Sequence, residues 1–137
     1  MDSENEQRDD LVVVHTGETY EGKQGHTFFA GISKETAGST HLCVHVVTIP
    51  PGAKDVPHLH EDHESAIYVV SGNALGRYGK DLQKTVAVGP GDFVYIPAGV
   101  PHQPMNASDT EPVVAVIART DPNEQESVIL LDANEQD

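Results

Sequence analysis

Histidines are the residues of this sequence best placed to do chemistry, because three of its eight histidines, His58, His60 and His63, fall within six residues. His58 and His60 are two residues apart, so on a β-strand both imidazoles point to the same face. Two imidazoles on one face form a bidentate clamp for a divalent metal ion. A polar, histidine-rich loop would give the same spacing without a metal, so the pair needs support from elsewhere in the chain.

That support comes from a distant histidine, His102, which directly follows the segment Ile96-Pro97-Ala98-Gly99-Val100-Pro101. Two prolines and a glycine fix the backbone just before this side chain. A rigid approach suits a metal ligand, because the geometry of a metal site must be held closely. The alternative interpretation is a surface loop with an isolated histidine.

The elements that must position these side chains are β-strands. Short apolar or β-branched runs alternate along the chain with turns rich in Gly, Pro, Asn and Asp. No window shows a helical period over about a dozen residues. This pattern predicts an all-β sandwich or barrel in which alternate residues of each strand face inward. The predicted strands are residues 11–15, Thr27–Ile32, residues 41–49, Ser65–Ser71, Ala74–Tyr78, Lys84–Val88, Phe93–Ile96, Val113–Arg119 and residues 127–131.

Length and charge limit the classes of protein. With 137 residues, the chain suits one domain, predicted at residues 11–131 between two acidic tails, 1–10 and 132–137, that we expect to be disordered. The net charge of −14 argues against binding to nucleic acid or to a membrane surface. No signal-peptide pattern is visible, and no apolar stretch approaches the ~20 residues that span a bilayer. We therefore expect a cytoplasmic protein.

Two stretches of the sequence surround these histidines with glycine, proline and asparagine at fixed spacings. The first stretch runs from Gly52 over five residues to His58 and His60 and ends, after an apolar strand, at Gly72. The second runs Gly91, five residues, Pro97, one residue, Gly99, two residues, His102, three residues, Asn106. These stretches resemble the two motifs of the cupin family. The second matches that family at every defining position, and the resemblance covers residues 49–106 by motif.

The resemblance implies a double-stranded β-helix, the jelly-roll barrel, that binds one divalent transition metal ion, either Fe, Mn, Ni, Cu or Zn. It assigns His58, His60 and His102 as ligands together with a glutamate, but the place of that glutamate is held by Ser65. Strand parity favours His63 as the fourth ligand, which would give a four-histidine site. Alternatively, a β-bulge turns Glu64 inward, or water fills the position beside Ser65.

The function implied by this resemblance is a metal-dependent enzyme that acts on a small oxygenated organic molecule, with dioxygenase chemistry as the first choice. Whichever of His63 and Glu64 is not a ligand could act as a general base. An isomerase, epimerase or cyclase is the alternative enzyme class. A non-catalytic small-molecule sensor or storage protein is the alternative outside enzymology, and the missing glutamate supports it.

Several further residues have weaker interpretations. His41, Cys43 and His45 share a face of one predicted strand; an outer face or an interface is favoured for the histidines, and a buried apolar role for the thiol. Arg77 and Arg119 could meet an anionic substrate, although surface solvation is favoured for both. By parity, the barrel lining is predicted to include Ile67, Val69, Val94 and Ile96, with Tyr68 outside. Residues 11–15 are expected to cover an edge strand in a homodimer, as cupins often do.

Overall fold

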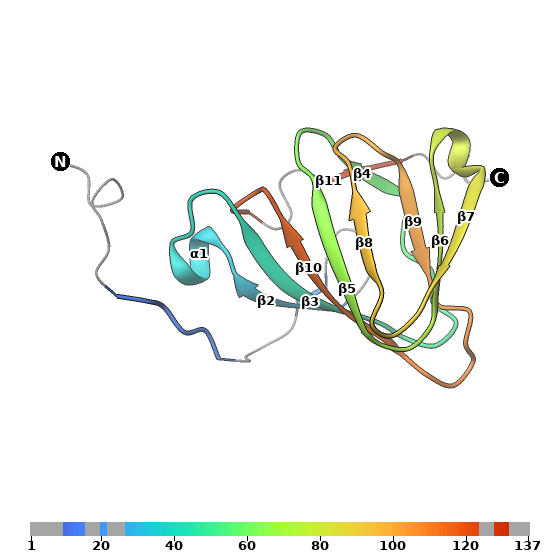
Figure 1. Cartoon of the computed structure of the whole chain (residues 1–137), viewed down its shortest axis with the longest axis horizontal. Coiled ribbons are helices and arrows are strands. Elements are labelled where there is room, and N and C mark those ends of the chain that lie inside the picture. The colour runs from blue at the N-terminus through green and yellow to red at the C-terminus, as the bar shows by residue number, and fades with distance from the viewer. Residues whose placement is uncertain (1–9, 16–19, 22–26, 124–127, 132–137) are drawn as a thin grey trace.

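The computed structural model describes residues 10–15, 20–21, 27–123 and 128–131 and is nearly all β. Two antiparallel sheets face each other and enclose an interior, which gives a jelly-roll β-barrel (Figure 1). In this part of the chain, no helix combines the length and the apolar character needed to cross a membrane.

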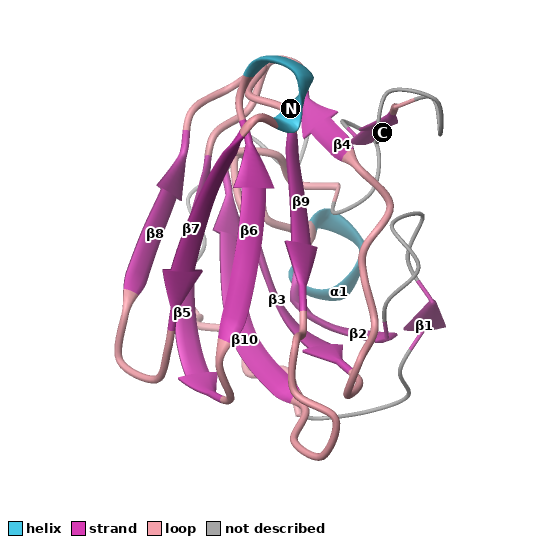
Figure 2. Ribbon diagram, turned by 90° about the vertical axis from the view of Figure 1, so that its right-hand side faces the viewer, coloured by secondary structure: helices cyan, strands magenta, loops and turns pink. Residues whose placement is uncertain are grey.

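The larger sheet has six strands and the smaller sheet has five. The spatial order in the larger sheet is β1 (Tyr20–Glu21), β2 (Thr27–Ile32), β3 (Cys43–Ile49), β10 (Val113–Arg119), β5 (Ser65–Ser71) and β8 (Phe93–Ile96). The spatial order in the smaller sheet is β11 (Val128–Leu130), β4 (His58–His60), β9 (His102–Met105), β6 (Ala74–Tyr78) and β7 (Lys84–Val88). Figure 2 shows β6, β7 and β9 side by side in front of β3 and β10.

Alternation of buried and less buried residues explains why these segments form strands. In β3, every second residue is buried, and β10 pairs with it antiparallel so that Ala115 lies opposite Val47. Each fully buried Val or Ile side chain stabilises the fold by roughly 1.5–3 kcal/mol. The buried apolar core consists of Phe28, Val47, Ile49, Ala74, Val113 and Ala115. This core occupies one part of the interior and leaves polar side chains at another.

Glycine is required at the turn that joins β5 to β6. Gly72 has a φ of +83°, and a Cβ atom there would lie 2.3 Å from the carbonyl oxygen of Pro112. Any other residue would therefore clash with backbone atoms as well as adopt a strained conformation. The turn ends the first conserved motif and sends the chain from the larger sheet to the smaller one.

Most predicted strands are confirmed, several at the predicted bounds. The prediction for residues 11–15 is wrong: this segment belongs to neither sheet, lies away from both in Figure 1, and leaves Leu11 83% exposed. Three short strands (β1, β4 and β9) were not predicted, nor were the helix α1 (Lys34–Ala37), capped by Ser33, and the 3-10 turn η2 (Lys80–Leu82). Residues 1–9 and 132–137, which cover nearly all of the predicted tails, lie outside the described residues.

Candidate metal centre

Three histidines converge at one end of the barrel. His58 and His60 lie on β4, and His102 opens β9 directly opposite His58 in the antiparallel register. One nitrogen atom from each of the three rings lies within 4.8 Å of the others. The three residues are 3%, 3% and 8% exposed, respectively. Converging, buried imidazole nitrogens are the donor set that divalent transition metals prefer.

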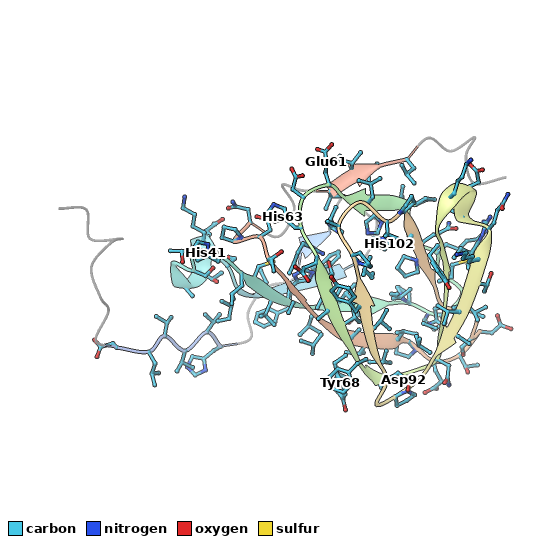
Figure 3. All side chains as sticks on the ribbon, turned by 45° about the horizontal axis from the view of Figure 1, so that its top comes forward. His41, Glu61, His63, Tyr68, Asp92 and His102 are labelled. Atoms are coloured by element: carbon cyan, nitrogen blue, oxygen red, sulfur yellow. The ribbon has the colours of Figure 1, made fainter. Side chains whose placement is uncertain are left out.

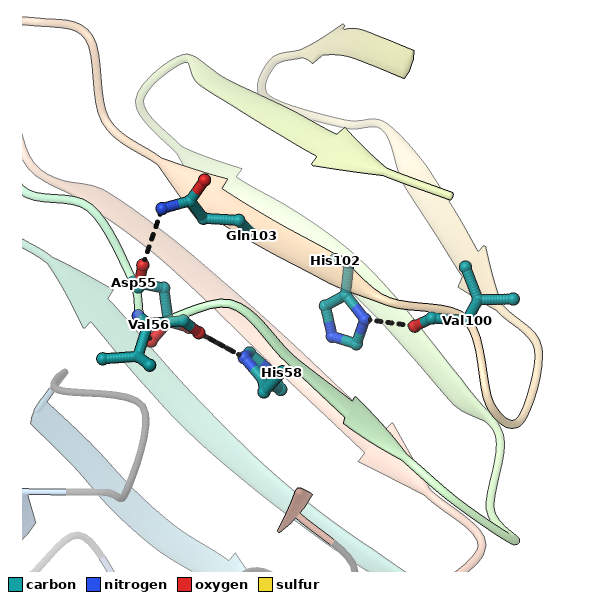
Figure 4. A network of polar contacts seen from close by, with 6 residues as sticks. All are labelled: Asp55, Val56, His58, Val100, His102 and Gln103. Atoms are coloured by element: carbon teal, nitrogen blue, oxygen red, sulfur yellow. Dashed lines mark hydrogen bonds and ion pairs between the residues drawn. The ribbon is translucent and has the colours of Figure 1, made fainter. Parts of the chain in front are cut away.

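Backbone carbonyl groups orient two of the rings. The Nδ1 atom of His58 lies 2.8 Å from the carbonyl oxygen of Val56, and that of His102 lies 2.9 Å from the carbonyl oxygen of Val100 (Figure 4). A carbonyl oxygen only accepts, so each Nδ1 carries the proton and each Nε2 keeps a lone pair for a metal. Such partners fix the orientation of metal-binding histidines.

The Asp55 carboxylate lies close to the Nδ1 atom of His58. Its Oδ2 atom lies 3.9 Å from the Nδ1 atom of His58, and its side chain is buried. The carbonyl oxygen of Asp55 accepts a hydrogen bond from the Gln103 amide, at 3.2 Å, which links the β4 and β9 segments (Figure 4). A carboxylate near the distal nitrogen of a metal-binding imidazole raises the basicity of that ligand.

The second motif folds as a rigid loop that closes against β4. Gly99 adopts a φ of +80°, and its N–H donates to the carbonyl oxygen of His60 at 2.8 Å. At the end of the motif, the Asn106 amide donates to the carbonyl oxygens of Ile49, Pro50 and Glu111. The motif asparagine therefore has a structural role, while the glycine brings the His102 segment to the His60 strand.

The charge state of the histidines suits a metal. Burial, with Arg119 as the second cause, lowers the pKa of His60 to about 2. Burial also lowers the pKa of His102, against a hydrogen bond to Val100 that raises it. Metal ions bind the neutral form of imidazole, so these rings are ready for a metal at neutral pH without losing a proton. The donor set and its protonation therefore fit a divalent transition metal ion.

A cavity of about 380 Å³ lies between the two sheets, and the three histidines form part of its wall. The predicted lining residues Ile67, Val69, Val94 and Ile96 all line it, so that prediction is confirmed. Tyr68 points to the outside, as predicted, where its ring packs against Phe93. An apolar cavity of this size with a few polar groups at one end is typical of a small-molecule site.

Arg119 was expected at the surface, and the structure shows that this expectation is wrong. Arg119 is 3% exposed, lines the cavity and donates from Nε to the hydroxyl oxygen of Ser65 at 3.2 Å. Both residues lie on the larger sheet, directly opposite each other in the β5–β10 pair. Arg119 shares the buried strand face of Val113 and Ala115, but the sequence is apolar on both faces of this strand and so gave no signal for the inner one.

The structure does not bring His63 or Glu64 into the three-histidine group. The Nε2 atom of His63 lies 3.8 Å from Oδ2 of Asp121, and Figure 3 shows His63 well apart from His102. The Glu64 carboxylate accepts a hydrogen bond from the hydroxyl group of Tyr95 at 2.9 Å. Tyr95 contributes to the cavity wall but is 62% exposed, and Glu64 is itself exposed and not part of that wall.

His45 was expected on an outer face, but it is 1% exposed and lies inside the barrel. Neither of its ring nitrogens has a hydrogen-bond partner among the described residues. Its ring packs edge-on against Phe28 with 5.0 Å between ring centres, and burial, followed by the charge of Arg119, lowers its pKa to about 3. Cys43 is fully buried, as predicted, whereas His41 is exposed.

Comparison with known proteins agrees with this geometry. The family model for the cupin domain matches residues 45–118, which is more than half of the chain. No protein with a curated description matches. Among solved structures, the chain is similar to Bacillus subtilis oxalate decarboxylase studied for its Mn(II) centres (25% identity, TM-score 0.70, 84% of this chain and 30% of that one). It is also similar to the Lactobacillus farciminis oxalate decarboxylase–formate complex (24% identity, TM-score 0.69, 83% and 33%).

This chain therefore spans about a third of the length of those decarboxylases. The family match covers both histidine motifs, and the three-histidine group supports metal binding. The chain belongs to the cupin family and has the features of a metal-binding member.

Proposed function

We propose that this chain is a metal-dependent enzyme that acts on a small oxygenated organic molecule. His58, His60 and His102 would hold one divalent ion of Fe, Mn, Ni, Cu or Zn. The observation that carries the proposal is the convergence of three buried imidazoles, two of them oriented through Nδ1, at one end of an apolar cavity. A bound ion would supply Lewis acidity or, for a redox metal, the means of bringing a chelating substrate together with dioxygen.

The residues of the chain supply the rest of the site. The apolar lining excludes water from the substrate, and this strengthens electrostatic interactions at the polar end. We propose Glu64 as the general base: its carboxylate accepts a hydrogen bond from Tyr95, a residue of the cavity wall, and it would have to turn inward from the exposed surface to reach a substrate. The fourth-ligand prediction for His63 or Glu64 stays a prediction, and each side chain would first have to leave its present partner, Asp121 or Tyr95.

Two reactions suit this site. Oxygenation by dioxygen is the first to test. Decarboxylation is the second, and the likeness to Bacillus subtilis oxalate decarboxylase, whose Mn(II) centres are described, favours it. A sensor that binds a ligand without turnover is the alternative outside enzymology, and it is favoured by Ser65 at the place where the family pattern has a glutamate.

The decisive experiment measures metal content by mass spectrometry on untagged protein to which no metal has been added, followed by oxygen consumption and carbon dioxide release with a panel of diketones, phenols and carboxylic acids. We expect close to one equivalent of metal and turnover of at least one compound. The variant H58A should lose the metal, whereas H41A, which changes an exposed histidine, should keep it. Protein that neither holds nor rebinds metal would refute the proposal, and metal binding without turnover would favour the sensor.

We also propose that the chain forms a homodimer. Leu11 and Val13 are 83% and 64% exposed, and Phe93, on the edge strand β8, is 80% exposed. Exposed apolar side chains, one on an edge strand and two in a segment outside both sheets, favour association with a second copy. Light scattering should give twice the mass of the chain, and F93S should shift the equilibrium toward the monomer. A monomeric mass for the unmodified protein would contradict this proposal.

A further inference from the structure

Ser65 occupies the place where the family pattern has a ligand carboxylate, and Arg119 lies beside it on the neighbouring strand. Ser65 opens β5 and is 4% exposed, and Arg119 ends β10 directly opposite it. The Nε atom of Arg119 donates to the Ser65 hydroxyl oxygen at 3.2 Å, and both residues line the cavity. A negative protein group has thus been replaced by a neutral hydroxyl group and a neighbouring guanidinium.

The guanidinium lies close to the histidine group. Its positive charge is among the causes that lower the pKa of His60, His102 and His45, which sit on both sheets around it. Arg119 therefore stands at the metal-binding end of the cavity and not at the end occupied by the apolar core.

The charged side chains of the described cavity wall sum to a positive value. Among the described residues that line the cavity, the Asp and Arg side chains are Asp55, Arg77 and Arg119. Three neutral imidazoles would leave the full double charge on a divalent ion, whereas a carboxylate ligand would cancel half of it. A low-dielectric cavity with this balance favours an anionic ligand over a neutral one of the same shape.

We propose that the cavity binds a small carboxylic acid in its ionised form and that Arg119 recognises the carboxylate. The ligand itself thereby supplies the negative charge that a glutamate supplies in the family pattern. The planar guanidinium fork matches a carboxylate in shape and charge. Ile67, Val69 and Val94 provide an apolar wall for a short hydrocarbon body. This inference names the substrate class of the proposed enzyme and rests on that proposed function for the metal.

The test compares acids with their neutral amides. Isothermal titration with acetate, isovalerate and benzoate, and with the matching amides, is carried out on Co(II)-loaded and metal-free protein. We expect at least one acid to bind about tenfold or more tightly than its amide. R119M should remove that preference, so that each acid and its amide bind with similar affinity. R77M removes the same charge from the other sheet of the same cavity and should have the smaller effect. Equal affinity for acid and amide, or a preference that survives R119M, would overturn the proposal, as would no binding of any acid.

Two further variants guard against a folding failure of R119M. R119K keeps the charge without the fork and should retain part of the preference. S65E restores a carboxylate beside Arg119 and should abolish the preference for acids while the metal is still bound. Circular dichroism and melting temperature verify that each variant folds.

Metal content is measured separately, so the two proposals fail in different ways. If the protein binds no metal but still prefers acids through Arg119, the proposed metal-dependent function is refuted and the carboxylate site is retained. Protein that binds metal and ignores the charge of the ligand refutes the carboxylate site alone.

Discussion

The two sheets contribute different polar side chains to the histidine end of the barrel. The smaller sheet carries His58, His60 and His102, buried and clustered, with the Nδ1 atoms of His58 and His102 held by backbone carbonyl groups. The larger sheet carries Arg119, which lines the same cavity, and the buried His45, whose ring nitrogens lack hydrogen-bond partners among the described residues.

The difference shows that the smaller sheet holds metal-donor nitrogens in a fixed geometry, whereas the larger sheet contributes the positive charge of Arg119. Orienting hydrogen bonds lower the cost of holding three imidazoles in one geometry. An imidazole without partners costs free energy and contributes nothing to a metal site unless a ligand engages it. We expect mutations on the two sides to separate accordingly.

The largest effect should come from the donor side. H102A removes a nitrogen from the cluster, and we expect the metal affinity to fall by more than about 100-fold, because loss of a mere supporting partner already costs about 10- to 100-fold. Competition titration with a chelating dye measures this change, and H41A is the matched control. Unchanged affinity in H102A would mean that the metal, if any, binds elsewhere.

The pH dependence of stability tests both sides together in metal-free protein. Burial lowers the pKa of His45 to about 3 and that of His60 to about 2, whereas both titrate near 6.5 in the unfolded chain. Below pH 6.5 both imidazoles are protonated in the unfolded chain but stay neutral in the folded protein, so the free energy of unfolding decreases as the pH falls. Between ~pH 7.5 and ~pH 5.5, each of these histidines should cost about 1.4 kcal/mol, measured by urea denaturation. Stability that does not decrease over this interval would contradict the burial of neutral rings.

A smaller effect isolates His45. H45L replaces a buried polar ring by an apolar side chain, and we expect the protein at ~pH 7.5 to gain about 1 kcal/mol in unfolding free energy. The same variant should lose roughly half of the combined pH effect of His45 and His60, while H41L, at an exposed position, should change little. A destabilised H45L, or one with weaker metal binding, would show that His45 supports the site.

The smallest effect should come from the loop beside the larger sheet. His63 faces Asp121, so H63A should change the metal affinity by less than about threefold. A loss beyond about tenfold would reveal that His63 joins the ligands when the metal binds, which is the four-histidine site that the sequence predicts.

The sequence predicted the strands well where apolar residues alternate, as in β3, β5 and β10. It also predicted the convergence of His58, His60 and His102, because motif spacing carries that information. The choice of His63 rested on extending the parity of β5 backward. Because β5 begins only at Ser65, alternation does not fix the orientation of His63, and its role as a ligand stays a prediction.

Arg119 and His45 escaped prediction for a different reason. Charged and polar side chains are mostly exposed, so composition alone assigns them to the surface. Both β3 and β10 carry apolar residues on each of their two faces, so alternation did not say which face is the inner one, and only the structure shows that both side chains lie on the buried face. Functional residues are often those that break the general rule of burial.

The register of β4 and β9 has a consequence for how faithfully the barrel assembles. His58 and His102 are directly opposite each other, and a slip by one residue would turn one of the two rings out of the cavity. A metal ion would then bind most tightly to chains in which β4 and β9 have paired in this register, and by mass action it would enrich them over misaligned ones. Metal binding would therefore stabilise the native pairing of β4 and β9 over a shifted one, independently of any substrate.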